Sequence, residues 1–172
     1  MADALKAVAR VKKSDRPVHH TVVGDGPLRG SLHRLASELD LDAEVRFLGA
    51  RNREEVATVL REAHILIAPS LTAASGDQEG IPNVLKEAMG SGLPVVSTVH
   101  SGIPELVEDG VSGYLVPERD VGALADRIVH LIDRPEDWPA MGRAERTRVK
   151  SEYSDERLNA RLAELYEALV SS

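Results

Sequence analysis

The sequence contains no cysteine, and this absence alone excludes several kinds of chemistry. Without thiols there can be no disulfide framework, no thiol nucleophile and no cysteine-bound metal, which fits a reducing compartment. No apolar run reaches the roughly 20 residues that a membrane span needs. Residues 1–13 also lack the apolar core of a signal peptide. We therefore expect a cytoplasmic protein.

An excess of positive charge is lacking as well. The formal net charge is -7, which argues against non-specific nucleic-acid binding, because that needs a basic face. Hydrophobic residues make up 42% and charged residues 28% of the chain, as in soluble globular proteins and unlike disordered ones. The 172 residues are enough for one domain with its own core, which we expect to cover residues 1–172.

Short β-branched runs alternate with helical patterns along most of the chain. Strands are expected at residues 18–24, 44–49, 64–70, 93–98 and 113–117. Helices are expected at residues 2–13, 27–41, 53–63, 83–91 and 120–134, with two closing helical segments around 136–150 and 154–170. This order predicts an α/β fold, a Rossmann-like doubly wound parallel sheet with helices on both faces. Ligands of such sheets bind beyond the carboxyl ends of the strands, so the candidate loops are 24–27, 49–53, 70–83 and 98–104.

Two short motifs favour plain structural interpretations. GDGPLRG (24–30) nearly matches the dinucleotide fingerprint, but its third glycine comes one position late, and Glu44 lies at the beginning of the second strand, not at its end. We interpret the motif as a tight strand-to-helix turn, with Gly24 and Gly26 as candidates for a phosphate-proximal loop. DLD (40–42) falls at a helix end on the opposite edge and predicts a solvated turn. The six histidines lack metal-binding spacing, so no metal site is predicted.

The strongest signal is a pair of glutamates, Glu79 and Glu87, on either side of a Gly-Ile-Pro bend and a helix start. The preceding loop, SLTAASGDQEGIP, is long for a strand-to-helix connection, and such loops are often functional. Pro82 suits the first turn of a helix. The next backbone amides, of residues 83–85, have no partners within the helix and can attract phosphate.

The two carboxylates then have separate predicted roles. Glu87 is four residues after Asn83 and shares its helix face, so it can accept hydrogen bonds from a diol such as a ribose while the helix end binds phosphates. Glu79 precedes the bend and would point into the cleft beyond the phosphates, where a sugar would lie.

These motifs resemble those of the family 4 retaining glycosyltransferases, which have the GT-B fold. The resemblance covers nearly the whole chain, as the carboxyl-terminal donor-binding domain, through VVGDGP, VRFLGA, ILIAPS, EGIPNVLKEAMGSGLPVVST and SGIPELVEDGVSGYLV. The form of the central stretch is most similar to bacterial exopolysaccharide enzymes of the colanic-acid type.

The resemblance implies a role for each candidate residue. Glu79 would be the catalytic residue that bonds the donor sugar, and Glu87 would bind the ribose. The donor sugar and diphosphate would contact Gly80, Ile81, Pro82, Asn83 and Val84. The base would lie against Ala50, Arg51 and Arg53. The nucleotide sugar is a substrate, and neither metal nor other cofactor is expected.

The sequence also departs from the family pattern. The usual opening strand and its Gly-Arg…Lys-Gly segment, whose Arg and Lys clamp the diphosphate, are absent before Met1, and Lys12 and Lys13 come too late to replace them. The amino-terminal acceptor domain is absent too, and with it any contact with a membrane-associated acceptor. We expect an isolated domain, a truncated gene product or half of a split enzyme. Its opening and closing helices should expose apolar surface, to be covered by self-association or by repacking of the last helix.

The sequence thus predicts the donor-binding half of an enzyme that transfers a sugar from a nucleotide-diphosphate sugar, of UDP type, to a saccharide or lipid-linked acceptor. The alternative is a nucleotide-sugar-binding module, or a subunit without activity of its own. A third interpretation is a doubly wound domain with a decayed site. The base, the sugar, the acceptor and the linkage are left open.

Overall fold

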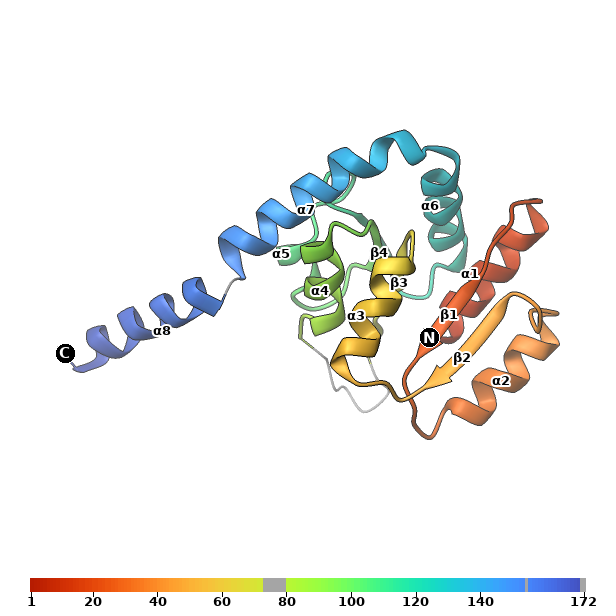
Figure 1. Ribbon diagram of the computed structural model, residues 1–172, viewed down its shortest axis with the longest axis horizontal. Helices are drawn as coiled ribbons and strands as arrows, with labels where there is room; N and C mark the ends of the chain where they lie inside the picture. The colour runs from red at the N-terminus through yellow and green to blue at the C-terminus, as the bar shows by residue number, and fades with distance from the viewer. Residues whose placement is uncertain (73–79, 154, 171–172) are drawn as a thin grey trace.

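The computed structural model describes residues 1–72, 80–153 and 155–170 (Figure 1). The strands are β1 (His20–Val23), β2 (Val45–Gly49), β3 (Leu66–Ala68), β4 (Val95–Thr98) and β5 (Tyr114–Val116). The helices are α1 (Ala2–Lys13), α2 (Arg29–Glu38), α3 (Arg53–Glu62), α4 (Asn83–Ser91), α5 (Ile103–Leu106), α6 (Val121–Asp133), α7 (Trp138–Glu152) and α8 (Asp155–Val170). The strand–helix alternation expected from the sequence is confirmed.

Local signals explain why most element boundaries were predictable. Helix α4 begins directly after Pro82 and ends at Gly92, which has a left-handed φ of 74° and donates its amide to Met89. Helix α5 and a 3₁₀ turn at Pro135–Asp137 were not predicted. Helix α5 has only four residues, too few for a helical repeat of apolar positions to be visible in the sequence.

All the strand pairs are parallel, but the strands form two sheets. Strand β1 pairs with β2, with His20 opposite Val45 and a bulge after Val22. The second sheet has the order β3-β4-β5, with Leu66 opposite Val95. Strands β1 and β3 are not hydrogen-bonded to each other. The single parallel sheet predicted from the sequence is therefore split between these two strands.

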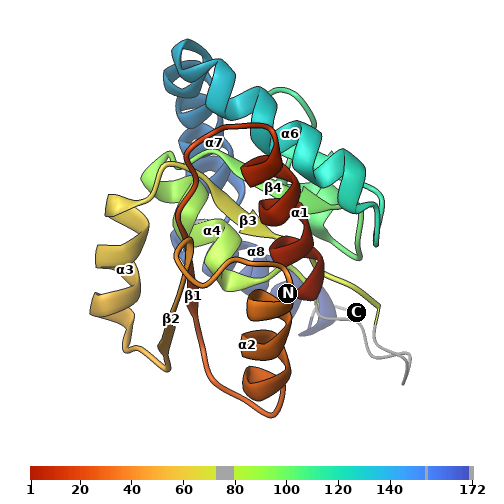
Figure 2. The ribbon, with the colours of Figure 1, turned by 90° about the vertical axis from the view of Figure 1, so that its right-hand side faces the viewer.

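Helices cover both faces of the three-stranded sheet, which is the doubly wound arrangement expected (Figure 2). Successive residues of β4 point to opposite faces, so Val96 packs with α1 and α6 while Val95 packs with α3, α4 and α5. A third apolar cluster lies between α1, α2 and β2 and includes Leu5, Ala36 and Phe47. The α/β fold with parallel strands and two helical layers is therefore confirmed.

The expectation that α1 exposes apolar surface is wrong. Its apolar residues Ala4, Leu5, Ala7, Val8, Ala9 and Val11 are all buried. The helix packs closely on α6 and also contacts α2, so its two apolar faces join the first and third clusters. The helix therefore buries its apolar residues against two neighbouring helices and also against strand residues such as Val96, without the opening strand that we had considered necessary.

The two closing helices differ in their surroundings. Helix α7 packs against α4, and a Cβ built on Gly142 would lie 2.6 Å from the Gly92 carbonyl oxygen, so the two backbones are in close contact. Helix α8 projects away from the body of the protein (Figure 1) and exposes Leu162, Leu165 and Tyr166. Exposure of the closing helix is therefore as expected, without repacking. Within the described residues, no helix is both long and apolar enough to cross a bilayer.

Candidate nucleotide-sugar site

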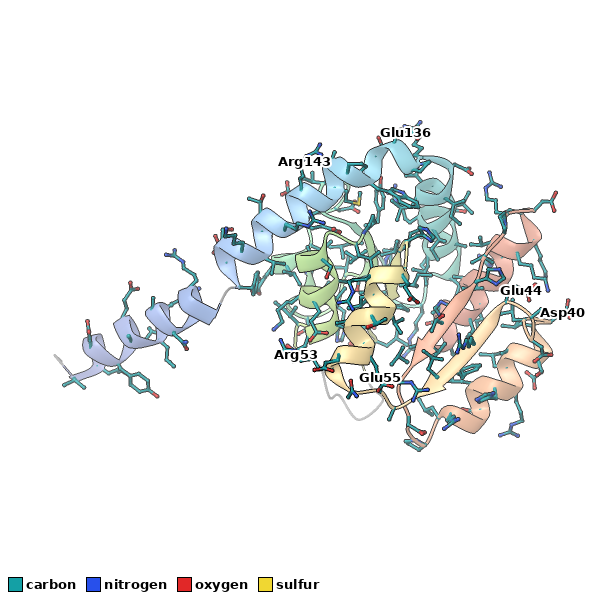
Figure 3. All side chains as sticks on the ribbon, in the orientation of Figure 1. Asp40, Glu44, Arg53, Glu55, Glu136 and Arg143 are labelled. Carbon is teal, nitrogen blue, oxygen red and sulfur yellow. The ribbon has the colours of Figure 1, made fainter. Side chains whose placement is uncertain are left out.

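Because the strands of each sheet run in the same direction, their carboxyl ends lead into loops at one edge of that sheet. Figure 3 shows Arg53 and Glu55 near the carboxyl end of β2, and Asp40 and Glu44 at the opposite end of that strand. The turn at Asp40 forms ion pairs with Lys12, which also contacts Glu44 at 3.1 Å. The interpretation of DLD as a turn away from the candidate loops is confirmed.

The loops after β1 and β2 are bonded to each other. The Gly24 amide donates to the Gly49 carbonyl at 2.9 Å. Asp25 forms an ion pair with Arg29 at 2.9 Å, and both side chains lie beside the Cα of Gly49. A Cβ built on Gly24 or Gly26 would meet no atom within 4 Å, so a ligand could approach this backbone closely. The role of both glycines near a phosphate stays a prediction.

The proposed base-binding residues lie at the start of α3. Asn52 and Glu55 form a capping box, in which the Asn52 side chain accepts from the Glu55 amide and Glu55 accepts from the Asn52 amide, both at 2.9 Å. This box holds the loop that contains Ala50, Arg51 and Arg53, which are all exposed. Arg51 lies 3.8 Å from the Glu55 carboxylate, which partly neutralises it. The loop is therefore fixed by hydrogen bonds where it enters α3, and its side chains are open to solvent.

The amino-terminus of α4 offers fewer amides than the sequence indicated. Pro82 is the N-cap and has no side-chain cap bond. The Leu85 amide donates to the Pro82 carbonyl at 3.1 Å, so the expectation that it is available is wrong, because the first turn closes on itself. Within the described part of the chain, no acceptor is bonded to the amides of Asn83 and Val84. As far as the described residues go, these two amides are open to an anion.

Glu87 lies on the solvent side of α4. Its carboxylate is exposed, like Asn83 one turn earlier, whereas Leu85, Ala88 and Met89 are fully buried. Helical periodicity predicts a core stripe of Val84, Leu85 and Ala88, which is confirmed for Leu85 and Ala88, whereas Val84 is only partly buried. The shared exposed face of Asn83 and Glu87 is as predicted. Because Asn83 and Glu87 are both exposed, a diol could reach Glu87 from the side of the helix amino-terminus.

The bend before α4 contacts the loop after β4. A Cβ built on Gly102 would lie 3.0 Å from Ile81 Cγ1, so the Ile81 side chain packs directly over Gly102. Gly80 is exposed and Pro82 is buried, so the bend is open to solvent at its first residue and packed in the protein at its last. Glu79, the predicted catalytic residue, lies outside the described residues. Its role stays a prediction.

A partly buried polar cluster in the neighbouring loops was not predicted from the sequence. His100 Nδ1 lies 2.6 Å from Glu118 Oε1, and the Thr72 amide and hydroxyl donate to the same carboxylate at 3.1 Å each. These bonds to His100 and Thr72 hold the pKa of Glu118 below its usual value. The 98–104 loop had been singled out as a whole, but one histidine and one threonine carry no recognisable motif.

Hydroxyl groups of β4 fix the end of β3. Ser97 donates to the Ala68 carbonyl and Thr98 to the Ser70 carbonyl, both at 2.7 Å, and both side chains are buried. The start of the loop that leads to α4 is therefore anchored to the second strand of the same sheet. Within the described residues, no three His, Asp or Glu side chains gather as a metal site would require. Independence from metal stays a prediction.

The parallel strands and the two helical layers define a Rossmann-like domain, and the solved structures that it resembles are GT-B glycosyltransferases. HepE from Anabaena, whose structure was solved in complex with UDP-glucose, matches with a TM-score of 0.81 and 26% identity. The match covers 96% of this chain and 44% of that chain.

The chain belongs to the family of glycosyl transferases group 1, whose model matches residues 1–134. The amylovoran biosynthesis glycosyltransferase AmsK of Erwinia amylovora is 42% identical over 97% of this chain. The putative colanic acid biosynthesis glycosyltransferase WcaL of Escherichia coli is 40% identical over 96% of it. In both cases the chain spans 41% of the relative's length. The predicted family and the similarity to colanic-acid-type enzymes are confirmed.

Proposed function

We propose that this chain is the donor-binding part of a retaining glycosyltransferase that takes its sugar from a nucleotide-diphosphate sugar of UDP type. The observation that carries the proposal is the amino-terminus of α4, where the amides of Asn83 and Val84, which donate to no described residue, lie one helical turn before the exposed carboxylate of Glu87. A helix end with available amides binds phosphate. A carboxylate on the same face accepts hydrogen bonds from a ribose diol.

In this proposal each loop at the carboxyl edge contacts one part of the donor. The helix end binds the diphosphate and Glu87 the ribose, while Gly80, Ile81 and Pro82 line the sugar together with Glu79. The exposed loop at Ala50, Arg51 and Arg53 takes the base, and the open backbone at Gly24 and Gly26 lies near a phosphate. The order base, ribose, diphosphate and sugar then runs along one edge of the protein.

The reaction that follows breaks the bond between the anomeric carbon and the diphosphate oxygen and forms a bond from that carbon to an acceptor oxygen. The nucleoside diphosphate leaves with the bonding electron pair and an additional negative charge, and the proton of the acceptor hydroxyl is released to the departing phosphate oxygen or to solvent. Helix-end amides stabilise this charge as it develops, which makes electrostatic stabilisation a main source of rate. The chain needs no metal for this role, and the acceptor is a saccharide or a lipid-linked saccharide.

Two similarities support the donor and the acceptor class. HepE, with the same fold, binds UDP-glucose according to its description, and AmsK is named for amylovoran biosynthesis. Because the chain spans 41% of such relatives, acceptor binding requires a part of the relatives outside the matched region. The second candidate is a nucleotide-sugar-binding module or a subunit of a split enzyme, without transfer activity of its own.

Calorimetric titration with UDP-glucose, GDP-mannose and ADP-glucose tests the proposed donor. We expect UDP-glucose to bind best, with a Kd in the sub-millimolar range, corresponding to about -4 to -5 kcal/mol. Neutral amides hold a diphosphate less tightly than charged side chains do, so tighter binding is not expected. Absence of binding by all three nucleotide sugars would contradict the proposed function. Sugar transfer to an added acceptor by these 172 residues alone would exclude the second candidate.

Helix α8 leads to a separate expectation about association between copies of this chain. Leu162, Leu165 and Tyr166 are 50–62% exposed on its projecting surface, and exposed apolar patches of this kind favour self-association. We expect Leu165→Glu to lower the weight-average mass measured by sedimentation equilibrium at high protein concentration. Ala160→Glu, on the opposite side of the same helix, is the matched control and should leave that mass unchanged. A wild-type protein that stays monomeric would contradict this expectation.

A further inference from the structure

Three loops at the carboxyl edge are joined by one carboxylate. Glu118, in the loop after β5, accepts hydrogen bonds from the Thr72 amide and hydroxyl, at the start of the loop that leads to α4. The same carboxylate contacts His100 Nδ1 at 2.6 Å, in the loop after β4. Glu118 thus holds together Thr72, which lies 46 positions earlier in the chain, and His100, which lies 18 positions earlier.

The protonation of the His100 ring follows from its partners. An ionised carboxylate can only accept hydrogen bonds, so His100 Nδ1 must carry the proton of this contact. Bonding to His100 and Thr72 lowers the pKa of Glu118, in agreement with an ionised carboxylate. The His100 side chain is 1% exposed, and its Nε2 has no hydrogen-bond partner in the described part of the chain. Among the described residues, the contact with Glu118 is therefore the hydrogen bond that orients the ring.

Backbone strain lies next to both partners. Ser101 directly follows His100 with φ of 47°, and Arg119 directly follows Glu118 with φ of 64°. Residues other than glycine adopt this left-handed conformation at a cost, and they keep it when surrounding contacts determine the backbone. The His100–Glu118 bond is a contact of this kind, because it joins the residues immediately before the two strained positions.

The loop that His100 orients contacts the bend before α4. The His100 carbonyl accepts from the Ile103 amide at 3.0 Å, which closes the turn over Ser101 and Gly102. Ile81 packs on Gly102, and Pro82, the next residue, is the N-cap of α4. A continuous set of contacts therefore runs from Glu118 through His100 and Gly102 to Ile81.

We propose that His100 is a positioning residue of the donor site, which acts through the Glu118 bond and the Gly102 turn to place Ile81 and the bend at 80–82. This inference rests on the proposed function, in which that bend lines the donor sugar. Loss of the His100–Glu118 bond should affect the sugar part of the donor, since the ribose-binding Glu87 lies on α4 beyond the bend. A purely structural His–Glu pair would lower stability without distinguishing between ligands.

Titration of variants with UDP and UDP-glucose tests this inference. We expect His100→Leu and Glu118→Gln to weaken UDP-glucose binding about tenfold, because one hydrogen bond to a charged group is lost. UDP affinity should change by less than about twofold, because in the proposed site UDP contacts α4 and the 49–53 loop and not the bend that His100 positions. His100→Asn, whose amide nitrogen can still donate to Glu118, should stay near wild type. Glu136→Gln removes an exposed carboxylate far from this edge (Figure 3) and is the matched control for charge.

A measurement without ligand separates this inference from the proposed function. In methyl-labelled protein, His100→Leu should shift the Ile81 methyl resonances and leave those of Ile128 unchanged, since Ile128 is buried on the opposite face with α6. If the wild-type protein bound neither ligand, the proposed function would fail. The Ile81 resonances would still show whether His100 determines the position of the Ile81 side chain. An unchanged Ile81 signal in both His100→Leu and Glu118→Gln, or equal losses of UDP and UDP-glucose affinity, would overturn the inference.

Discussion

Glutamine in place of Glu145 is expected to stabilise the protein at pH 8 and to flatten the dependence of its stability on pH. Glu145 lies on α7 and is completely buried. Burial raises the pKa of its carboxyl group to about 8, although the Val95 amide and the Arg146 charge act in the opposite direction. Neither carboxylate oxygen makes a hydrogen bond within the described residues, so these two groups compensate only partly.

The sign of the effect follows from proton binding. The folded pKa of about 8 exceeds the ordinary value of 4.5, so between these values the folded state holds a proton that the unfolded state has lost. The free energy of unfolding therefore decreases as pH rises through this window, by at most about 1.4 kcal/mol per pH unit. Allowing for relaxation around the charge, we expect a total loss of about 2–4 kcal/mol by pH 8.

Urea denaturation at pH 5, 6, 7 and 8 measures this effect. Glu145→Gln should match wild type within about 1 kcal/mol at pH 5 and exceed it by about 2 kcal/mol or more at pH 8, with an unchanged m-value. Glu152→Gln removes an exposed carboxylate from the same helix and should follow the wild-type curve. Parallel pH curves for wild type and Glu145→Gln would show that Glu145 titrates normally in the folded protein.

Substitution of Glu87 by alanine is expected to weaken UDP binding by about 1.5–3 kcal/mol, which is the usual cost of losing a hydrogen bond to a charged group. The carboxylate is exposed on α4, four residues after Asn83, and in the proposed site it accepts from the ribose. Since every nucleotide ligand contains the ribose, UDP and UDP-glucose should lose similar amounts of affinity. Glu62→Ala, an exposed residue at the far end of α3, should have no effect.

A comparison with Glu79→Ala makes this test specific. Glu79 is assigned to the donor sugar, so its replacement should weaken UDP-glucose and leave UDP binding nearly unchanged. Calorimetry on both variants with both ligands gives four affinities. Only the affinity of Glu79→Ala for UDP should stay near the wild-type value. Equal losses of UDP affinity in the two variants would contradict the assignment of the two glutamates.

Much of the candidate site was predictable because it depends on local signals and on topology. Pro82 before α4 and Gly92 after it limit that helix, since proline suits a helix start and glycine accepts the left-handed φ of the end. The exposure of Asn83 and Glu87 follows from helical periodicity. The meeting of the 24–27 and 49–53 loops follows from parallel strand order, which places successive loops at one edge.

The sequence by itself therefore determined the order of the elements, the polar face of α4 and the edge at which the loops gather. The tertiary structure alone decided the division into two sheets and the burial of α1 on α2 and α6. It alone also decided that Glu145 is buried and that His100, Glu118 and Thr72 meet. Propensity and periodicity act over a few neighbouring residues. Contacts between residues 18 or 46 positions apart depend instead on how whole elements pack, which no local pattern contains.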